Sequence, residues 1–344
     1  SIAVMAGISE GEVAVYDRQL RLWGVQAQQR LLSAKVLVWG LEGCNVEVCK
    51  NLVLAGVSLT IRDHRMVATA DVAFDYFLRE GDIGQNRAKC ASQRVQEMNP
   101  LCTVSSSSDA PEEISDAAAL RAALKGYDVV VLALGVLGFD VAQASIVDAA
   151  CRDVDTSFLM TLSSGEMAFF FSNLHEHTMH EKSSAQGAGA VATPQAPTVE
   201  KFSFASFKEW LQCTPAELQR QKVDASILLV SLFLAFSHSN KQASPEMAGK
   251  FEDYCRTVAK CTPSVDGCAE LKDVYACFFL EPLMHVASVV AGLLAQEVIK
   301  AITKRDPPMM NSVCFNAHTS CALVERIPAP PKAPVKRKAE EVAD

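Results

Sequence analysis

The sequence predicts an α/β fold, in which a doubly wound and mostly parallel sheet is joined to a helical insertion. Strand and helix patterns alternate about five times between residues 35 and 162, which is typical of a parallel sheet with crossover helices. The first strand is followed by a glycine-containing tight turn and a helix, as at the opening of a nucleotide-binding unit. Residues 202–276 then read as mostly helical and carry no nucleotide signature.

The N-terminal region predicts helices that lead into the sheet. Glu10–Ser33 carries apolar residues at near-helical spacing, which predicts one or two amphipathic helices with Gly24 as the break. Lys35–Gly40 (KVLVWG) then reads as a buried strand, Gly43–Gly56 as the helix after it, and Ser58–Asp63 as the second strand.

The remaining α/β elements are apolar runs that alternate with helical patterns. We expect helices at Asn86–Met98, Ala117–Lys125 and Val141–Arg152, strands at Cys102–Ser106, Tyr127–Leu134, Phe158–Leu162 and Met167–Phe171, and a hairpin over Ser312–Glu325. Leu283–Ile299 is apolar enough to suggest a membrane span. It barely reaches spanning length and contains His285 and Glu297, so we expect a buried core helix and no membrane.

Five segments are expected along the 344 residues, a length that exceeds the usual single core. Residues 5–172 form the first part of the α/β domain. Residues 173–201 form a flexible linker, because Glu181–Pro197 within them is rich in Ser, Ala, Gly, Gln and Pro. Residues 202–276 form the helical insertion, and residues 277–327 complete the α/β domain. Residues 328–344, rich in proline and then in charge, are expected to be a disordered tail.

The turn after the first strand has lost two glycines of a dinucleotide fingerprint. Gly40-Leu41-Glu42-Gly43-Cys44-Asn45 lies where G-x-G-x-x-G would be, with Glu42 at the second glycine and Asn45 at the third. Glu42 would put a carboxylate where a phosphate docks on the helix N-terminus. The turn therefore predicts the fold of a nucleotide-binding unit without the binding, so that the chain needs a competent partner. Asp63 reads either as a ribose ligand or as a strand-end cap that remains from an ancestor.

Composition and cysteine spacing exclude several other functions. The net charge of −8 argues against nucleic acid as the main ligand. The twelve cysteines match no compact secreted framework, no secretory leader is recognised, and we expect reduced thiols in the cytosol or nucleus. No C-x-x-C pair occurs, which argues against a classical zinc site. The cysteines of the middle region stand in no active-cysteine motif and read as buried hydrophobes; they are Cys255, Cys261, Cys268 and Cys277.

Two further patterns allow two interpretations each. The run His175-x-His177-x-x-His180 could bind a metal, but it borders the expected linker, and we predict no metal ligand there. Lys336-Arg337-Lys338 in the tail reads equally as a nuclear import signal or as a solvated basic cluster.

Several motifs, in order along the chain, resemble those of ubiquitin-like-protein activating enzymes. The longest is Tyr16–Gly24 (YDRQLRLWG). The others are Lys50–Gly56 (KNLVLAG), Asp63-His64, Gly84–Ala88 (GQNRA), Ala291–Ala301 (AGLLAQEVIKA) and Arg305–Pro308 (RDPP). The resemblance covers about residues 7–327 and implies a Rossmann-like adenylation domain.

In that family two related adenylation halves pair. One half binds ATP, Mg²⁺ and the C-terminus of the modifier and carries a catalytic cysteine, while the other is degenerate. The lost glycines make this sequence similar to the degenerate half, and its length is most similar to the smaller, non-catalytic partner of heterodimers that activate SUMO. The resemblance implies that this chain binds no cofactor or metal itself, and that its partners are the catalytic subunit of the SUMO-activating enzyme and SUMO. A contact with the SUMO-conjugating enzyme stays open, and the family's role implies a nuclear and also cytoplasmic location.

Arg18 is the residue that the resemblance singles out for chemistry. In the family the arginine of the Tyr-Asp-Arg-Gln run reaches in trans to the ATP phosphates in the partner's pocket, and the match falls on Arg18. A guanidinium is always charged and forks onto phosphate oxygens. The alternative is a solvated arginine that pairs with Asp17 or Glu12 on an amphipathic helix.

Other functions stay open at this point. These are a self-sufficient adenylating homodimer like the molybdopterin-synthase activating (MoeB-like) proteins, the regulatory subunit of the NEDD8-activating enzyme, a dinucleotide oxidoreductase, and a scaffold without a catalytic group.

Overall fold

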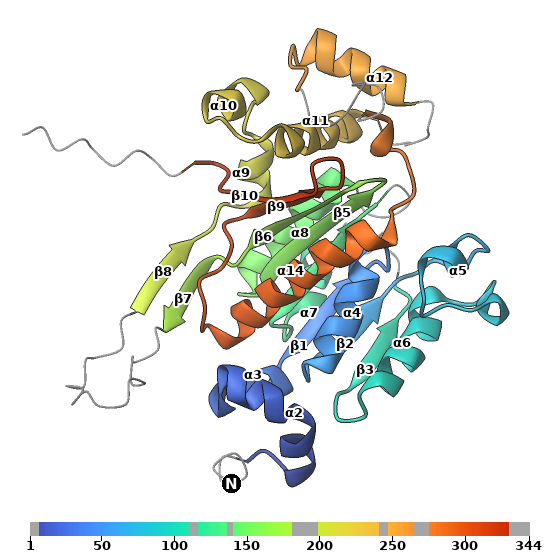
Figure 1. Ribbon diagram of the computed structural model, residues 1–344, viewed down its shortest axis with the longest axis vertical. Coiled ribbons are helices and arrows are strands. Elements are labelled where there is room, and N and C mark those ends of the chain that lie inside the picture. Colours follow the sequence, from blue (N-terminus) through green and yellow to red (C-terminus); the bar gives the residue numbers. More distant parts are fainter. Residues whose placement is uncertain are drawn as a thin grey trace, which may run out of the picture.

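An eight-stranded sheet forms the centre of the molecule in the computed structural model, which describes residues 7–109, 116–135, 140–180, 199–240, 247–263 and 275–329. Its strands run in the order β10-β9-β6-β5-β4-β1-β2-β3 (Figure 1). They are β1 (Lys35–Trp39), β2 (Ser58–Arg62), β3 (Val104–Ser107), β4 (Val129–Leu134), β5 (Ser157–Ser164), β6 (Met167–Asn173), β9 (Ser312–Asn316) and β10 (Cys321–Glu325). Strands β1 to β5 pair in parallel, whereas β6, β9 and β10 pair antiparallel. The predicted doubly wound, mostly parallel sheet is confirmed.

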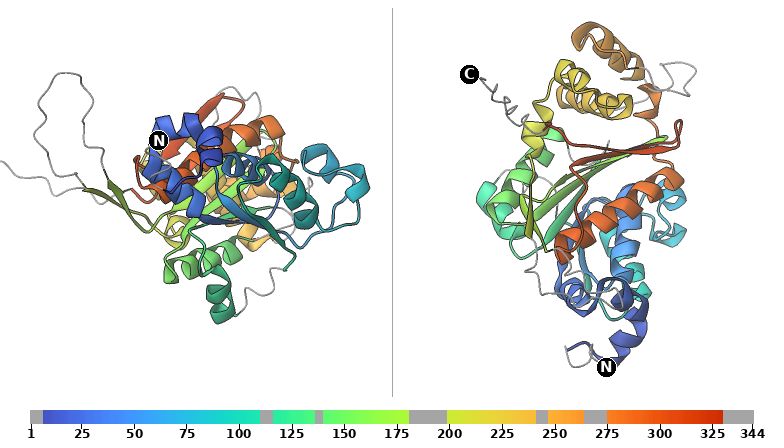
Figure 2. Two further views of the ribbon diagram at one scale, coloured as in Figure 1. Left: turned by 90° about the horizontal axis from the view of Figure 1, so that it is seen from below. Right: turned by 60° about the vertical axis from the view of Figure 1, so that its left-hand side comes forward.

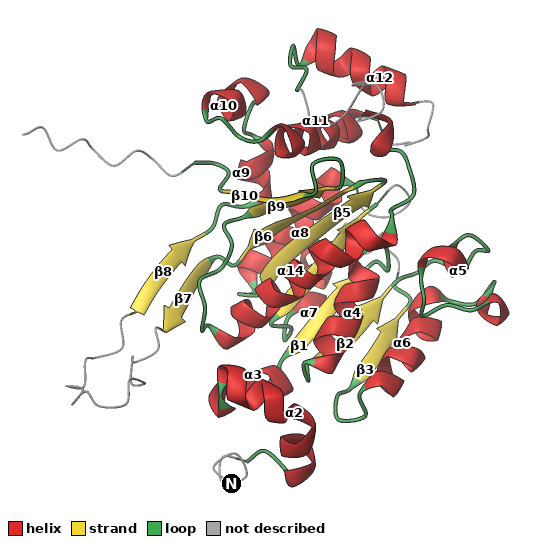
Figure 3. Ribbon diagram, in the orientation of Figure 1, coloured by secondary structure: helices red, strands yellow, loops and turns green. Residues whose placement is uncertain are grey.

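Helices cover both faces of this sheet (Figure 3). Helix α14 packs against α4 and β6, and α4 packs against α6, while α8 packs against β4, β5 and α7 on the opposite face. These helices are α2 (Glu10–Trp23), α3 (Val25–Ser33), α4 (Cys44–Leu54), α5 (Asp71–Phe74), α6 (Arg87–Met98), α7 (Ala117–Leu124), α8 (Val141–Asp153) and α14 (Met284–Thr303), with a short 3₁₀ turn η1 (Glu80–Asp82).

Alternation along the central strands divides the core into two clusters. On β1, Leu37 and Trp39 join the cluster that contains α7 and α8, whereas Val36 and Val38 join the cluster of α4 and α14. All six residues of β4 are buried, because helices cover both faces of this parallel strand. The strand order reverses between β1 and β4. Doubly wound folds bind their ligands at the carboxyl ends of the two strands where this reversal occurs.

The insertion forms a helical layer at one end of the sheet. It comprises α9 (Phe207–Leu211), α10 (Pro215–Arg220), α11 (Ala225–Ser239), α12 (Met247–Asp253) and the π-helical turn η3 (Tyr254–Val258). This layer shares the core cluster of α8, and the indole Nε1 of Trp210 donates a hydrogen bond of 2.7 Å to the Ser312 hydroxyl on β9. The insertion is therefore packed onto the α/β domain and does not form a separate core.

The expectation of a flexible linker over residues 173–201 is wrong at both ends of that range, where the structure has strands. Within residues 173–201, β7 (Glu176–His180) pairs antiparallel with β8 (Val199–Ser203), and the ribbon projects from the sheet (Figure 2). The His177 and Phe202 rings lie 6.5 Å apart on the ribbon. The composition that suggested a linker lies in residues 181–198, outside the described residues, and it hid the two flanking strands.

Helix α14 is, within the described ranges, the one helix long and apolar enough to cross a membrane by length and composition. In the fold its buried face packs against α4, β6 and β9. Its one acidic residue, Glu297, is also buried, and it accepts hydrogen bonds from Lys300 Nζ at 2.5 Å and from the Met309 backbone N–H at 2.7 Å. This is the core helix that the sequence predicted.

Candidate functional site

The N-terminal helix α2 is anchored at Tyr16 and at Gln19, whose side chain donates a hydrogen bond of 3.1 Å to the Leu54 carbonyl oxygen, and Asp17, Arg18, Arg21 and Leu22 are exposed. A capping box between Ser9 and Glu12 fixes its start. Tyr16 is fully buried, and its hydroxyl accepts a hydrogen bond of 2.8 Å from the Asn99 side chain. The helix kinks at Tyr16, where the backbone is non-helical (φ −101°, ψ 16°). Residues that follow the kink therefore project from an anchored helix.

Arg18 is exposed on this helix, and it makes no hydrogen bond or ion pair with any part of the chain that the structure describes. The partners that the solvated alternative requires are used elsewhere: Asp17 pairs with Arg21 at 3.0 Å, and Glu12 with Ser9. Leu22, one helical turn beyond Arg18, is 69% exposed. A guanidinium without a partner among the described residues is available to a second protein, and arginine is enriched at protein interfaces.

The turn after β1 is shaped like a phosphate loop, but two of its amide groups already donate to side chains of the same chain. The Leu41 backbone N–H donates to the Asp63 carboxylate at 2.9 Å, and the Cys44 N–H donates to the Ser163 hydroxyl at 3.3 Å. Gly43 has φ +44°, and a Cβ there would lie 2.6 Å from the Ser163 Cβ, so glycine is required. Two of the N–H groups that could bind a phosphate near the start of α4 are therefore hydrogen-bonded within the chain.

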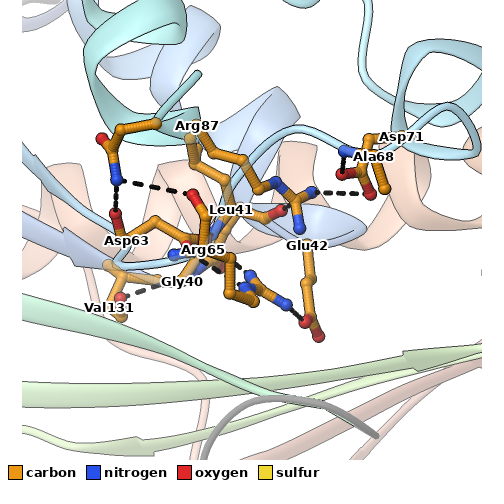
Figure 4. Close-up of polar contacts among 11 residues, drawn as sticks. Gly40, Leu41, Glu42, Asp63, Arg65, Ala68, Asp71, Arg87 and Val131 are labelled. Carbon is orange, nitrogen blue, oxygen red and sulfur yellow. Dashed lines mark hydrogen bonds and ion pairs between the residues drawn. The ribbon is translucent and has the colours of Figure 1, made fainter. Parts of the chain in front are cut away.

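Glu42 lies in this turn, and its carboxylate meets the Arg65 guanidinium (Figure 4). Its carboxylate contacts Gly135 at the end of β4 so closely that a Cβ at position 135 would overlap it. The other side of the carboxylate is ion-paired with the Arg65 guanidinium, which also binds both oxygens of Asp63, at 2.9 Å from Nε and 2.5 Å from Nη2. We call Glu42, Asp63 and Arg65 the internal ion triad.

The internal ion triad is largely removed from solvent. The side chains of Asp63 and Arg65 are 1% and 15% exposed. Burial alone would raise the pKa of Asp63, but the hydrogen bonds and charge of Arg65 hold it below its usual range. The two carboxylates likewise raise the pKa of Arg65 against the effect of burial. Asp63 is therefore an ionised partner of Arg65 and the Leu41 N–H, not a free ribose ligand, which agrees with the strand-end cap.

Asn45, at the third lost glycine, is also built into the fold. Its side-chain amide donates to the Gly40 carbonyl oxygen at 2.9 Å, and its carbonyl oxygen accepts from the Thr161 hydroxyl at 3.0 Å. Asn45 therefore joins the turn to β5 where a glycine would leave space. Arg65 was not singled out in the sequence, although its position two residues after Asp63 was a usable signal. Residues 136–139, which follow β4, lie outside the described residues.

The remaining candidates from the sequence are structural or are not described. His175 is buried, with its Nε2 2.7 Å from the Thr156 carbonyl oxygen, and burial lowers the pKa of His177 to about 4. The described cysteines are buried except for Cys213 and Cys321, and burial raises the pKa of Cys255 to about 12. A thiol held protonated in this way is a poor nucleophile. Cys268 and the basic tail cluster are outside the described residues.

Comparisons with known proteins match nearly the whole chain. The model of the ThiF family matches residues 16–337. SUMO-activating enzyme subunit 1 of Rattus norvegicus is 30% identical over 347 residues, which cover 92% of this chain and 95% of that protein. The proteins of the same name from Xenopus tropicalis and Homo sapiens are each 29% identical, over 93% of this chain and over 97% and 96% of their own lengths.

Solved structures share the fold at low sequence identity. A crystal structure of selenomethionine PaaA superposes with a TM-score of 0.57 at 14% identity and covers 93% of this chain and 84% of that chain. The crystal structure of E. coli MccB with MccA-N7isoASN gives a TM-score of 0.55 at 16% identity, over 93% of this chain and 74% of the other. These likenesses support the architecture alone.

Proposed function

The chain belongs to the ThiF family, and from that premise we propose that it is the smaller, non-catalytic subunit of a heterodimeric SUMO-activating enzyme. The proteins that match it over more than nine-tenths of its length carry the name SUMO-activating enzyme subunit 1. Such a subunit pairs with a catalytic subunit, and together they adenylate the C-terminus of SUMO and form its thioester.

The internal ion triad is the main observation that supports nucleotide binding by the catalytic subunit and not by this chain. A nucleotide site needs free amide donors and space for phosphates, whereas here Asp63 and Ser163 occupy the donors and Glu42 occupies the space. The residues present therefore do not fit ATP. It follows from the proposal that ATP and Mg²⁺ bind in the catalytic subunit and that this chain alone is inactive.

Arg18 is the group that this chain supplies to the reaction. Attack of the SUMO carboxylate on the α-phosphate of ATP expels pyrophosphate, and negative charge moves onto the departing oxygens. A guanidinium held beside those oxygens stabilises the charge as it develops, as arginine does in other phosphoryl transfers. The exposure of Arg18, its lack of a partner within the described residues and the anchored helix beneath it support this role.

The internal ion triad opposes the alternatives in which this chain binds a nucleotide. A MoeB-like homodimer and a dinucleotide oxidoreductase both need an open phosphate loop. The NEDD8 regulatory subunit does not, but it is a much longer chain, whereas this one spans 97% of its Xenopus tropicalis relative. A scaffold without chemistry differs from the proposal in the role of Arg18.

Further parts of the proposal concern partners and location. We propose SUMO and the catalytic subunit as partners, the SUMO-conjugating enzyme as a further partner that binds the insertion, and a nuclear as well as cytoplasmic location. Fluorescence microscopy of the tagged full chain, with and without Lys336→Ala, Arg337→Ala and Lys338→Ala together, tests the location and the import signal.

The isolated chain is expected not to bind Mg-ATP, because the loop amides and the phosphate space are already occupied. Isothermal titration of the purified chain with Mg-ATP measures this, with the purified heterodimer as the positive control. Micromolar binding by the isolated chain that is lost when the Gly40–Gly43 loop is mutated would contradict the prediction and favour the self-sufficient enzyme.

The SUMO thioester is expected on the partner alone. Burial raises the pKa values of Cys255 and Cys261, so these thiols stay protonated at neutral pH. A non-reducing gel of the heterodimer charged with SUMO and ATP should show one thiol-sensitive adduct, on the catalytic subunit. A thiol-sensitive adduct on this chain would refute the prediction.

A further inference from the structure

Three side chains of types that can bind metal ions come from distant parts of the sequence and lie together at the ends of the sheet strands. Glu166 lies in the turn between β5 and β6, Cys277 in the segment before α14, and His318 in the turn between β9 and β10. The Glu166 Oε2 is 2.6 Å from the His318 Nε2, and the Cys277 Sγ is 3.8 Å from the same nitrogen. One ligand atom from each residue lies within 4.8 Å of the other two.

A pocket of about 370 Å³ opens beside these atoms. Its walls include Gly165, Leu280, Glu281 and Leu283 in addition to the three side chains. Cys277 is 5% exposed as a residue, while the side chains of His318 and Glu166 are 22% and 39% exposed. The thiol therefore forms the floor of the pocket, and the imidazole and carboxylate form its rim.

The geometry favours a bound cation over a nucleophilic cysteine. In a cysteine–histidine–carboxylate triad the carboxylate and the thiol contact opposite ring nitrogens. Here both approach the Nε2 of His318, so that a proton on this nitrogen is donated to Glu166 and the nitrogen cannot also accept from the thiol. Tetrahedral Zn²⁺ with bonds of roughly 2.0–2.3 Å places its ligand atoms roughly 3.3–3.7 Å apart. The three ligand atoms here lie within 4.8 Å of one another, so the ion fits once the 2.6 Å contact between Glu166 and His318 widens by about 1 Å.

We propose that Cys277, His318 and Glu166 bind one Zn²⁺ ion, with water as the fourth ligand. A thiolate and an imidazole prefer zinc to the hard cations Mg²⁺ and Ca²⁺, and the carboxylate is an accepted third ligand. On binding, the thiol proton leaves to solvent, and the neutral imidazole of His318 binds through Nε2 with its ring proton on Nδ1. The inference does not rest on the proposed function.

The surrounding hydrogen bonds already hold the three segments together. The Ser164 hydroxyl lies 2.9 Å from the carbonyl oxygens of both Cys277 and Leu280, and the Gly165 N–H donates to the Leu280 carbonyl at 3.2 Å. The backbone N–H of His318 donates to the Asn316 side chain at 2.9 Å. A metal at this point would link the segment before α14 to the turn between β5 and β6 and to the turn between β9 and β10. This is a structural role for zinc.

Cobalt is the probe for this site, because a Co²⁺–thiolate bond gives a charge-transfer absorption band. The purified full chain, treated with chelator and reductant, is titrated with Co²⁺ and then with Zn²⁺. We expect one Co²⁺ per chain with a thiolate band, and loss of the band when Zn²⁺ is added. The band should be absent in Cys277→Ser and retained in Cys321→Ser, a matched control whose cysteine is exposed on β10.

A second variant and a second measurement keep the test decisive if Cys277→Ser does not fold. His318→Gln changes a rim residue and should lower Zn²⁺ affinity at least tenfold, as loss of a ligand does. Zn²⁺ should raise the thermal midpoint of the wild type and of Cys321→Ser but not that of His318→Gln. Absence of the thiolate band in the wild type, or wild-type Co²⁺ binding by folded Cys277→Ser or His318→Gln, would overturn the proposal.

Discussion

Replacing Arg18 with alanine is expected to slow ATP–pyrophosphate exchange by the heterodimer about 10²- to 10³-fold, the usual cost of losing one preorganised contact to developing charge. The variant should fold and assemble normally, because Arg18 is exposed and forms no ion pair with the described residues, and even exposed ion pairs are worth only about 0–1 kcal/mol. The two effects differ enough in size to be separated. Arg18→Lys should recover only part of the rate, since a point charge does not reproduce the planar fork.

Exchange is measured at saturating SUMO, with size-exclusion chromatography of the same samples to establish assembly. Arg21→Ala is the matched control, because Arg21 lies one turn away on the same helix and is bound to Asp17. It should change the exchange rate much less than Arg18→Ala. Wild-type exchange by an assembled Arg18→Ala heterodimer would remove the catalytic role and leave the scaffold.

Replacing Arg65 with methionine is expected to lower the free energy of unfolding by about 3–5 kcal/mol, as removal of one partner from a buried ion pair does. Methionine keeps most of the volume of the side chain but leaves the carboxylates of Glu42 and Asp63 without their cation. Urea unfolding of the isolated chain at pH 7 measures the loss. Removing all three charges together, with Glu42→Gln, Asp63→Asn and Arg65→Met, should restore most of the stability.

The loss should depend on pH in one direction. The folded-state pKa of Asp63 is lowered, so its contribution to stability is present above its unfolded pKa of about 3.9 and is lost as the pH falls through the folded value. The difference between wild type and Arg65→Met should therefore be full at pH 7 and shrink below about pH 4. A constant difference across this range, or a fully stable single variant, would show that the ion triad does not stabilise the fold.

Much of the fold was predictable because its elements carry local signals. The β1 strand, the α4 helix and the hairpin of β9 and β10 follow from apolar runs bounded by turns, and all are confirmed. The ribbon of β7 and β8 was missed because it is short, lies outside the main sheet and flanks a segment of linker-like composition. Pairing across residues 181–198 is a nonlocal property that composition does not report.

The sequence alone predicts that the turn lacks two glycines of the fingerprint, but it does not predict which contacts the residues in their place make. Glu42 and Asn45 mark the missing glycines in the sequence itself. That Glu42 reaches the end of β4 and shares Arg65 with Asp63 depends on the order of strands β4, β1 and β2, which brings three separate strand ends together. The meeting of Glu166, Cys277 and His318 is nonlocal in the same way, since more than 150 residues separate the first from the last.

The internal ion triad also decides how this chain responds to the supply of ATP. An enzyme with an open nucleotide site gains stability as the free nucleotide concentration rises above its dissociation constant. Under the proposed function this chain binds no nucleotide, and the ion pair between Arg65 and Glu42 stabilises its folded state without one. In the proposed heterodimer, a fall in ATP concentration would then lower the stability of the catalytic subunit but not that of this chain. This chain would stay folded and keep its interface with the partner whose nucleotide site is empty.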